Sequence, residues 1–489
     1  MNLWVIIPEC ILLVWAFLLA TVWKERQDLA EPSGLLRACS GAMIAVIALG
    51  VAGFGGINTL FFNDTMGLFF KFAILAILVF SLFVMGGTQT WRGKDLSLLY
   101  LATFGCMIVA GANELATLFI GLNIATLSLW TFYWLVSSDE RDRAVVRRWF
   151  AFAVTAGATL AFGMSLIYGL SASTQLVQSK INLAIVHLTR ENIGVILAIA
   201  EVLLLVGVAG VLLAPPLAGK LSAESSDRIH PGVTVYRIAI MTTLGILLFA
   251  KIFDNNLSAF QGTEMNPNDW GILATVFASA AMILGAVFAL KSTDLMSVVV
   301  WLTMSQIGGV WQAWIWLTED GIVTAGFCYA ALLIALFAVT SVIAIVRGSS
   351  ADVDADSFAG LWHRSPLLGA IAIAGLVSMA GMPATVGYNA RLLWFESGIV
   401  AIGRESLGLW GYVAVASGAV GTLVSLVAIF PWVKRIVVSS AQASPVEWRG
   451  AQRVVALVMV LAIVLLGLFA SPLYQAVSGL PIAFGFLQR

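Results

Sequence analysis

Long apolar runs alternate with short polar stretches along the whole chain. A helix of about 20 residues crosses the roughly 30 Å hydrocarbon core of a bilayer, so each run of that length predicts one membrane-spanning helix. The sequence therefore predicts an all-α integral membrane protein with about fourteen spans. They are expected near 2–23, 40–58, 66–86, 96–111, 113–136, 149–170, 192–215, 231–253, 271–290, 296–317, 321–346, 366–397, 407–433 and 454–472.

The basic residues are distributed unevenly between alternate loops. Loops after odd-numbered spans carry most of the lysines and arginines, and an omitted span would scramble this asymmetry, which therefore supports an even count. Because basic loops remain in the cytoplasm, we expect a multi-pass protein of the cytoplasmic (inner) membrane with both termini on the non-cytoplasmic side. The opposite loops hold only Lys180, Arg190, Lys251, Arg404 and Arg489.

Two spans are interrupted by glycine and proline. The seventh contains GVAGVLLAPP (207–216), and the twelfth contains SMAGMPATVGYNARLLWFESG (378–398). Backbone groups freed by such breaks must be received by protein or by a water-filled cavity. Interrupted helices at matching places suggest inverted repeats around an ion path, here two five-helix repeats formed by helices 4–8 and 9–13. The expected units are 1–95 (helices 1–3), 96–253 (first repeat), 254–436 (second repeat) and 437–489 (helix 14). A polar loop is expected at 171–191, within the first repeat.

The amino-acid composition limits the classes of partner and cofactor that this chain is expected to bind. Of 489 residues, 60% are hydrophobic and 11% charged, against roughly 25% charged in soluble proteins. The net charge is zero, so nothing indicates a nucleic-acid partner. The four cysteines are far apart and form no CxxC motif, so we expect packing roles and no disulfide or metal site. Without a thiolate set or a phosphate-binding loop, the chain is expected to bind no cofactor.

Five segments resemble the antiporter-like membrane subunits of respiratory complex I, and most closely the subunit N family of bacterial NADH:quinone oxidoreductase. The similarity covers roughly residues 60 to 440 and agrees with fourteen helices. The segments are NELATLFIGLNIATLSLW (113–130), RRWFAFAVTAGATLAFGMSLIYGLSAS (147–173), HPGVTVYRIAIMTTLGILLFAKIF (230–253), DLMSVVVWLTMSQIGG (294–309) and FAGLWHRSPLLGAIAIAGLVSMAGMPATVGYNARLLWF (358–395).

The resemblance implies proton translocation along a row of ionisable side chains at the membrane midplane. At the matching positions of this chain the row is nearly missing. Only the lysine of the twelfth helix keeps a charge, as Arg391, and arginine does not release its proton in proteins. The other four positions hold side chains that do not titrate in the accessible range: Asn123, Val211, Thr242 and Gln306.

A few charged residues remain inside the spans. Arg391 and Glu396 are interpreted as an intramembrane pair, either a structural salt bridge or a participant in charge movement. Glu201 lies half way into the seventh span, and Arg237 of the eighth is its suggested partner. Buried charge in a membrane is costly, which makes these residues functional candidates. Four further charges are expected near the membrane surface: Glu9, Asp64, Lys71 and Lys251.

The leading hypothesis is a membrane-arm subunit of a complex I-like assembly that couples quinone reduction to proton translocation. The chain would have no catalytic site of its own, with quinone, flavin and iron–sulfur clusters in partner membrane and redox subunits. Within this hypothesis, protons move along Glu201, Glu396, Gln306 and Thr242, or the chain is a non-pumping spacer. Alternatives are a subunit of a multi-subunit cation/proton antiporter or of a membrane-bound hydrogenase.

Overall fold

The computed structural model describes residues 3–29, 31–53, 55–57, 60–86, 90–137, 140–189, 194–211, 230–257, 269–349, 355–403, 409–438 and 450–480. This part of the chain is almost entirely helical. The first group of helices comprises η1 (Leu3–Ile6), α1 (Ile7–Thr21), α2 (Pro32–Ala52), α3 (Thr65–Met85), α4 (Gly93–Gly111), α5 (Leu115–Val136), α6 (Glu140–Ser171), α7 (Leu176–Thr189), α8 (Gly194–Val211), α10 (Pro231–Phe249) and η2 (Ala250–Leu257).

The remaining helices follow in the second half of the chain. They are α11 (Asp269–Lys291), α12 (Leu295–Ile315), α13 (Glu319–Ser349), η4 (Ala355–Phe358), α14 (Leu361–Arg364), α15 (Pro366–Ala380), α16 (Val386–Gly403), α17 (Leu409–Val438), α18 (Gly450–Leu468) and α19 (Ser471–Val477).

Each predicted span overlaps a helix, and the twelfth overlaps the pair α15 and α16. In the described part of the chain, eleven helices are long and apolar enough to cross a membrane, or twelve if α18 and α19, bent by 93°, form one span. The all-α membrane class is confirmed, whereas the inverted repeats and the unit boundaries remain predictions. The predicted break of the seventh span lies largely outside the described residues, because α8 ends at Val211.

One expectation about the loops is wrong. The stretch 171–191 was expected to be a polar loop, but it contains helix α7. Its inward positions Leu176, Ser179 and Leu183 are spaced three and four residues apart and are buried, which is the spacing of one helix face. Polar residues separate these positions, so α7 has an amphipathic pattern and no continuous apolar run.

Local signals fix where several helices begin. Proline occupies the first turn of α1, α2, α10 and α15, where its missing N–H costs nothing. Asp64 caps α3 by accepting a hydrogen bond from the Gly67 N–H at 2.5 Å, and Asp294 caps α12 by accepting from Ser297 at 3.1 Å. Side-chain oxygens at this position satisfy otherwise unpaired helical donors.

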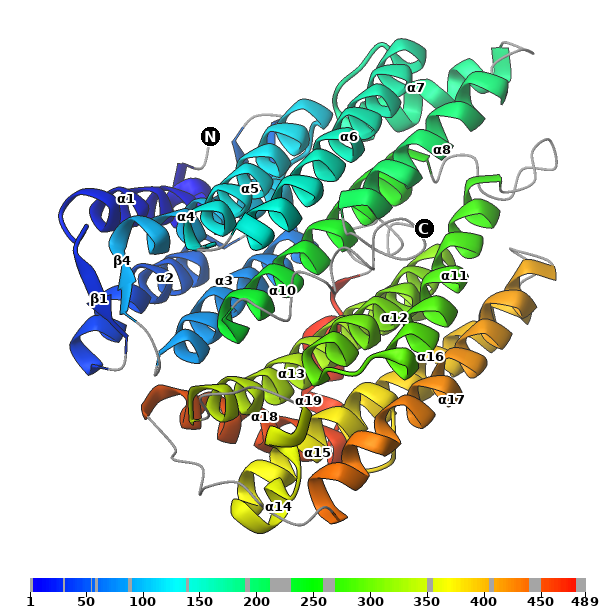
Figure 1. The fold of residues 1–489 in the computed structure, drawn as a ribbon. Helices are drawn as coiled ribbons and strands as arrows, with labels where there is room; N and C mark the ends of the chain where they lie inside the picture. The colour runs from blue at the N-terminus through cyan, green and yellow to red at the C-terminus, as the bar shows by residue number, and fades with distance from the viewer. Residues whose placement is uncertain are drawn as a thin grey trace.

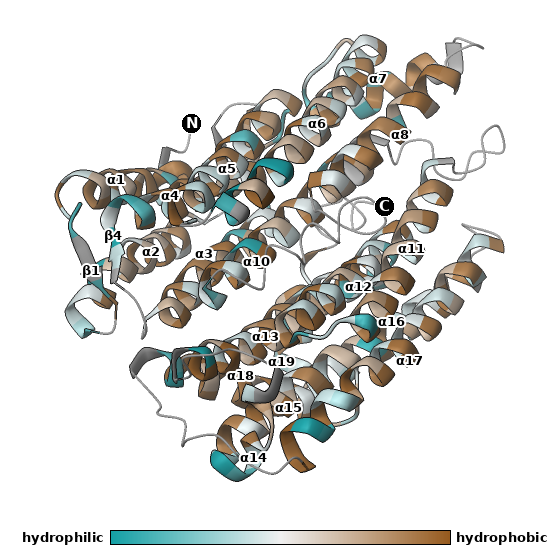
Figure 2. Cartoon of the chain, in the orientation of Figure 1, coloured by the Kyte–Doolittle hydropathy of each residue, from teal (hydrophilic) through white to brown (hydrophobic). Residues whose placement is uncertain are grey.

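The helices of the two sequence halves form two neighbouring groups, α1 to α8 and α11 to α17, as the colour gradient of Figure 1 shows. Helix α10 lies between them and packs against α3, α4, α8, α12 and α13. Every residue from Pro231 to Phe253 is buried. Because the whole helix is buried, its polar side chains are enclosed by protein. Apolar residues dominate the surrounding helices (Figure 2).

Contacts between loops agree with the odd and even loop assignment. Strand β1 (Arg26–Asp28) pairs with β4 (Thr90–Arg92), joining the loops after the first and third spans. Strand β2 (Gly55–Ile57) pairs with β3 (Phe61–Asn63) on the even side, where Phe61 also bridges to Ala112. Loops expected on one side of the membrane therefore meet one another.

Candidate functional site

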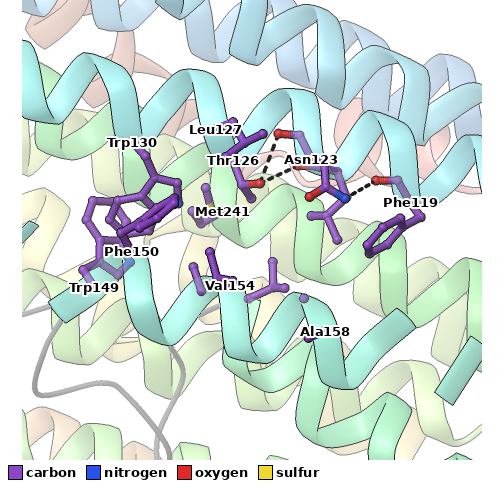
Figure 3. A pocket seen from close by; sticks show the side chains of 14 residues that line it. Phe119, Asn123, Thr126, Leu127, Trp130, Trp149, Phe150, Val154, Ala158 and Met241 are labelled. Atoms are coloured by element: carbon purple, nitrogen blue, oxygen red, sulfur yellow. Dashed lines mark hydrogen bonds between the residues drawn. The ribbon is translucent and has the colours of Figure 1, made fainter. Parts of the chain in front are cut away.

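Two of the four uncharged relay positions line one cavity in the first half of the fold. Asn123 on α5 and Val211 on α8 line this cavity of about 240 Å³, together with Met241 on α10. The remainder of the wall is mainly apolar and includes Trp130 (Figure 3). Two positions at which the family resemblance implies ionisable groups thus border a largely apolar space.

The Asn123 and Thr126 side chains of this cavity form hydrogen bonds to their own helix. The Asn123 side-chain amide donates to the Phe119 carbonyl at 2.8 Å, and the Thr126 hydroxyl donates to the Leu122 carbonyl at 2.8 Å. Both bonds return to the preceding turn of α5, and Figure 3 shows them running along the helix. These donors are therefore occupied, and neither side chain titrates, so the cavity wall offers no relay for protons.

Arg237 and Glu201 are both enclosed. Arg237 on α10 is 1% exposed, and its guanidinium lies 4.7 Å from the ring centre of Trp149 and 5.6 Å from that of Tyr133. Aromatic faces stabilise a cation that has lost its water. Glu201 on α8 is 4% exposed, and α8 packs against α10. The structure thus places both charges inside the protein, and their pairing remains a prediction.

Thr242 lies on the same central helix and is buried. Its neighbour Thr243 shares a 2.6 Å hydrogen bond with Tyr329 of α13, and Tyr236 shares one of 2.8 Å with Thr103 of α4. Helix α10 therefore carries several enclosed hydroxyl groups that contact different neighbouring helices. Of these hydroxyl groups only Thr242 was predicted from the sequence, because hydroxyl pairs between distant helices have no local sequence signal.

The predicted break of the twelfth span is present between α15 and α16. Gly381 ends α15 with a φ of +79°, a left-handed conformation that glycine adopts without a Cβ clash. Gly387 begins the next helix so close to α15 that a Cβ atom there would lie 1.8 Å from the Ser378 carbonyl oxygen. The Ser378 hydroxyl accepts from the Gly387 N–H at 3.2 Å, so protein receives a freed backbone group, as a break in a membrane requires.

Gln306 and Arg391 meet at this break. The Gln306 amide donates to the Met379 carbonyl at the end of α15 at 2.6 Å. Arg391 on α16 is 6% exposed, and its stem packs on Gly381, where a Cβ atom would lie 2.6 Å from Arg391 Cγ. Its guanidinium points toward Gly309 of α12, and Nη2 forms no hydrogen bond within the described structure. Arg391 was expected within the broken stretch, whereas the contact of Gln306 with the end of α15 was not predicted.

The predicted pair of Arg391 with Glu396 is wrong. No salt bridge joins them among the described residues, and Glu396 lies on the exposed face of α16. Five residues along a regular helix correspond to a rotation of about 140°, so the two side chains point in different directions. The α16 helix is unbroken between them, which removes the unwound turn that could have brought them together.

The strongest ionic contact inside the fold was not predicted. Glu9 on α1 and Lys71 on α3 form an ion pair of 2.6 Å, with 1% and 0% of their side chains exposed. Lys71 also donates to Asn63 Oδ1 at 2.5 Å and lies 4.3 Å from the centre of the Phe61 ring. Glu9 and Lys71 were expected near the membrane surface, and the structure shows both side chains enclosed by protein, because α2, α4, α10, α13 and α18 also pack around α1 and α3.

Lys251 belongs to the same ionic region. It is 3% exposed, and its Nζ lies 3.8 Å from Asp64 Oδ2. The expectation that Lys251 reaches outward to the membrane surface is also wrong, since the π-helical turn η2 retains it against α3. A lysine inside an apolar run, as in Phe70-Lys71-Phe72, was the sequence signal that could have indicated a buried cation.

The described residues contain no group of three or more His, Cys, Asp or Glu side chains able to hold a metal ion. All four cysteines are free. Cys39 and Cys106 are buried in the helical packing.

Comparison with known families identifies the fold. A family model described as NADH:quinone oxidoreductase/Mrp antiporter, transmembrane, matches residues 112–417. The chain belongs to this family. The matched region extends from the start of α5 into α17 and includes the α10 helix and the α15–α16 break. Glu9 and Lys71 lie outside it.

Curated relatives are similar at low identity. NAD(P)H-quinone oxidoreductase subunit 2 of Synechocystis sp. is 26% identical over 437 residues, which are 88% of this chain and 75% of the relative. NADH-quinone oxidoreductase subunit N of Acidithiobacillus ferrooxidans is 24% identical over 428 residues, or 86% and 85% of the two chains. The resemblance to subunit N is thereby confirmed, and the chain is a divergent member.

Solved structures share the fold. A chain of the membrane-bound sulfane sulfur reductase, an archaeal respiratory membrane complex, superposes with a TM-score of 0.83 at 15% identity, covering 99% of this chain and 98% of that one. A chain of respiratory complex I from Thermus thermophilus gives 0.77 at 16% identity and 99% coverage of both chains. A chain of the Mrp complex from Dietzia sp. gives 0.74 at 18% identity, covering 99% and 96%.

Proposed function

We propose that this chain is a membrane-arm subunit of a complex I-like NADH:quinone oxidoreductase that couples quinone reduction to proton translocation. The observation that carries the proposal is the family match across α5 to α17, together with relatives that are subunits of quinone oxidoreductases. The chain would contribute no redox centre. Quinone, flavin and iron–sulfur clusters would be bound by partner subunits, and the described part of this chain offers no cysteine cluster for them.

We further propose that proton movement through this member is reduced or rerouted. Asn123, Val211, Thr242 and Gln306 cannot exchange protons in the accessible range, and Arg391 retains its proton. The apolar cavity beside Asn123 and Val211 supports this proposal. Glu201 is a buried carboxylate on α8, which lines the region of the first-half relay positions, and this makes it the principal candidate for a proton-carrying group there.

The proposed location is the cytoplasmic (inner) membrane, with other membrane subunits and the lipid bilayer as partners and both termini on the non-cytoplasmic side. The distribution of lysine and arginine supports this orientation. Apolar side chains such as Phe17, Phe162, Leu423 and Phe430 are more than half exposed along the helices. Such a surface is compatible with lipid and with neighbouring membrane subunits.

The decisive experiment measures protons moved per electron pair by the reconstituted complex. We expect Glu201→Gln to lower this ratio, because glutamine cannot bind and release a proton, while the electron-transfer rate changes less. Glu396→Gln is the matched control, since the exposed Glu396 side chain is not expected to carry protons. A wild-type complex that reduces quinone without moving protons through this chain would instead identify a non-pumping spacer.

The main alternative is a subunit of a multi-subunit cation/proton antiporter, because the Mrp structure shares the fold. A subunit of a membrane-bound hydrogenase is the third possibility. Neighbouring genes distinguish these cases: quinone-site and iron–sulfur subunits favour the oxidoreductase, small antiporter subunits favour the second, and a nickel–iron hydrogenase favours the third. Sodium-dependent acidification of vesicles without any electron donor would also favour the antiporter.

A further inference from the structure

The ionic region around Lys71 lies apart from every relay position. It joins α1, the β3 strand, α3 and the η2 turn after α10 through Glu9, Asn63, Asp64, Lys71 and Lys251. Those are two acids and two bases, so their formal charges cancel. The charged groups that act on Lys71 are Glu9, Lys251 and Asp64. Such a cluster is enclosed but neutral overall, which lowers the cost of keeping charge inside a membrane protein.

Three polar atoms of this region form no hydrogen bond within the described structure. They are Oε1 and Oε2 of Glu9, both acceptors, and Nδ2 of Asn63, a donor, although Oε1 is held by its ion pair with Lys71. Glu9 and Asn63 contact the same Lys71 ammonium, at 2.6 Å and 2.5 Å. Because an unpaired buried polar atom is costly, the free acceptor Oε2 and the free donor Nδ2 around one ammonium suit a water molecule or a mobile proton.

The backbone beside Lys251 is also unusual. Residues Ala250–Leu257 form a π-helical turn that follows directly on α10. Such turns are rare and often occur at functional sites. Lys251 lies in this turn and forms an ion pair with Asp64 at the start of α3. The ion pair places the end of α10 beside the Glu9–Lys71 pair. The beginning of α1, the beginning of α3 and the end of α10 all belong to the side assigned as non-cytoplasmic.

We propose that the buried Glu9–Lys71 pair is a proton-exchange site, by which this chain transfers protons between its interior and its non-cytoplasmic side without the relay row. This inference rests on the proposed function as a proton-translocating subunit. Asp64 and Lys251 are positioning residues that adjust the electrostatic field at the pair. The 2.6 Å contact is short enough for direct proton transfer between the carboxylate and the amine.

The transfer balances in protons and charge. A proton from a hydronium ion adds to Oε2 of Glu9, forming an O–H bond, removing the carboxylate charge and leaving a water molecule. Lys71 then loses one N–H proton to a water molecule on the α10 side, which becomes hydronium, and the side chain becomes a neutral amine. Rotation of the Glu9 carboxyl group brings the protonated oxygen to Lys71 Nζ, and transfer of that proton restores the carboxylate–ammonium pair, so that one proton has entered and one has left without any redox change.

The test uses the intact complex in sealed vesicles and the double variant Glu9→Gln/Lys71→Met. Replacing both partners leaves no unpaired buried charge, and such replacements are often neutral for stability. We expect assembly and electron transfer to persist while the rate of proton transfer through this chain falls about 100-fold or more. The exposed Glu140–Arg147 pair, also 2.7 Å apart, gives the matched control Glu140→Gln/Arg147→Met, which should leave proton transfer unchanged.

A second measurement does not depend on assembly of the double variant. Infrared difference spectra of the wild-type complex should contain a protonated-carboxyl band that shifts in D2O, and Glu9→Asp should displace this band while Glu140→Asp, at an exposed carboxylate, leaves it unchanged. Wild-type proton transfer in the double variant, together with an unchanged band in Glu9→Asp, would reduce the pair to a structural clamp and leave the proposed function standing. A wild-type complex that transfers electrons but no protons would overturn both.

Discussion

At the scale of single residues, burial separates charges that the sequence treats alike. Arg391 and Glu396 both lie within one predicted span, yet one is buried beside Gly381 and the other is exposed. Glu9 and Lys71 lie within the first and third predicted spans, and both side chains are completely enclosed and paired. The chemical capacity of this protein thus depends on which ionisable groups have lost water, because desolvated groups must be paired or must change protonation.

His230 gives a residue-scale prediction outside the spans. It caps α10 by accepting a hydrogen bond from the Gly232 N–H at 3.1 Å, and burial, followed by the nearby charge of Arg347, lowers its pKa from 6.5 to about 4. In the unfolded chain it binds a proton at higher pH than in the folded protein. Stability should therefore fall as pH decreases from about 6.5 to about 4, by up to about 3 kcal/mol.

The measurement is the pH dependence of thermal unfolding in detergent. His230→Asn keeps a side-chain acceptor at the helix start and should remove most of the acid sensitivity in this window. The exposed His363 supplies the control variant His363→Asn, which should retain it. Equal acid sensitivity in all three proteins would show that His230 is not responsible.

At the scale of elements, the α15–α16 break is a tightly fitted turn and not a loose interruption. Gly381 and Gly387 allow the two half-helices to approach one another, and Gln306 of α12 binds the carbonyl end of α15. The charged end of Arg391 extends from this turn toward α12. The element therefore fixes the position of a permanent positive charge, where a titratable lysine would have allowed proton release.

We predict that Gly381→Ala destabilises the protein by about 1–3 kcal/mol. An alanine Cβ there would face a φ of +79° and lie 2.6 Å from Arg391 Cγ. Gly50→Ala in α2 is the control, because nothing lies within 4 Å of its added Cβ and alanine favours a helix. Melting temperatures in detergent should fall for the first variant and remain unchanged or rise for the second. Equal values would contradict the tight turn.

At the scale of the whole molecule, polar groups collect along one buried axis. Helix α10 carries Arg237, Thr242 and Thr243 through the middle of the fold and ends at Lys251 beside the Glu9–Lys71 pair. Both sequence halves pack against this helix (Figure 1). A route for protons that bypasses the apolar cavity of the first half would follow α10, since its hydroxyl and charged groups are already withdrawn from lipid.

The orientation in the membrane gives a prediction at this scale. In a cysteine-free background, Lys24→Cys should react with a membrane-impermeant maleimide only from the cytoplasmic side, and Gln178→Cys only from the other side. Both side chains are exposed, so access to reagent and not burial decides the result. Labelling of both positions from one side would contradict the odd and even loop assignment, and reversed labelling would contradict the orientation.

The sequence by itself determined the membrane class, the approximate spans and the uncharged side chains at the proposed relay positions, because continuous hydrophobicity and the identity of a side chain are local properties. It also located the α15–α16 break through its glycines and proline. Helix α7 was not predicted, because its sequence pattern is amphipathic and contains no continuous apolar run. The sequence shows directly that Asn123 and Val211 are uncharged, whereas the cavity that they line could not be predicted from it.

Only the tertiary structure decided which charges are buried together. Spanning helices are apolar on most sides, so their sequences contain little information about how each helix is rotated. Contacts between α1 and α3 and between α3 and η2 enclose Glu9, Lys71 and Lys251, and the regular turn of α16 separates Arg391 from Glu396. Ion pairing depends on distances of a few ångströms between elements far apart in the chain, and packing alone sets those distances.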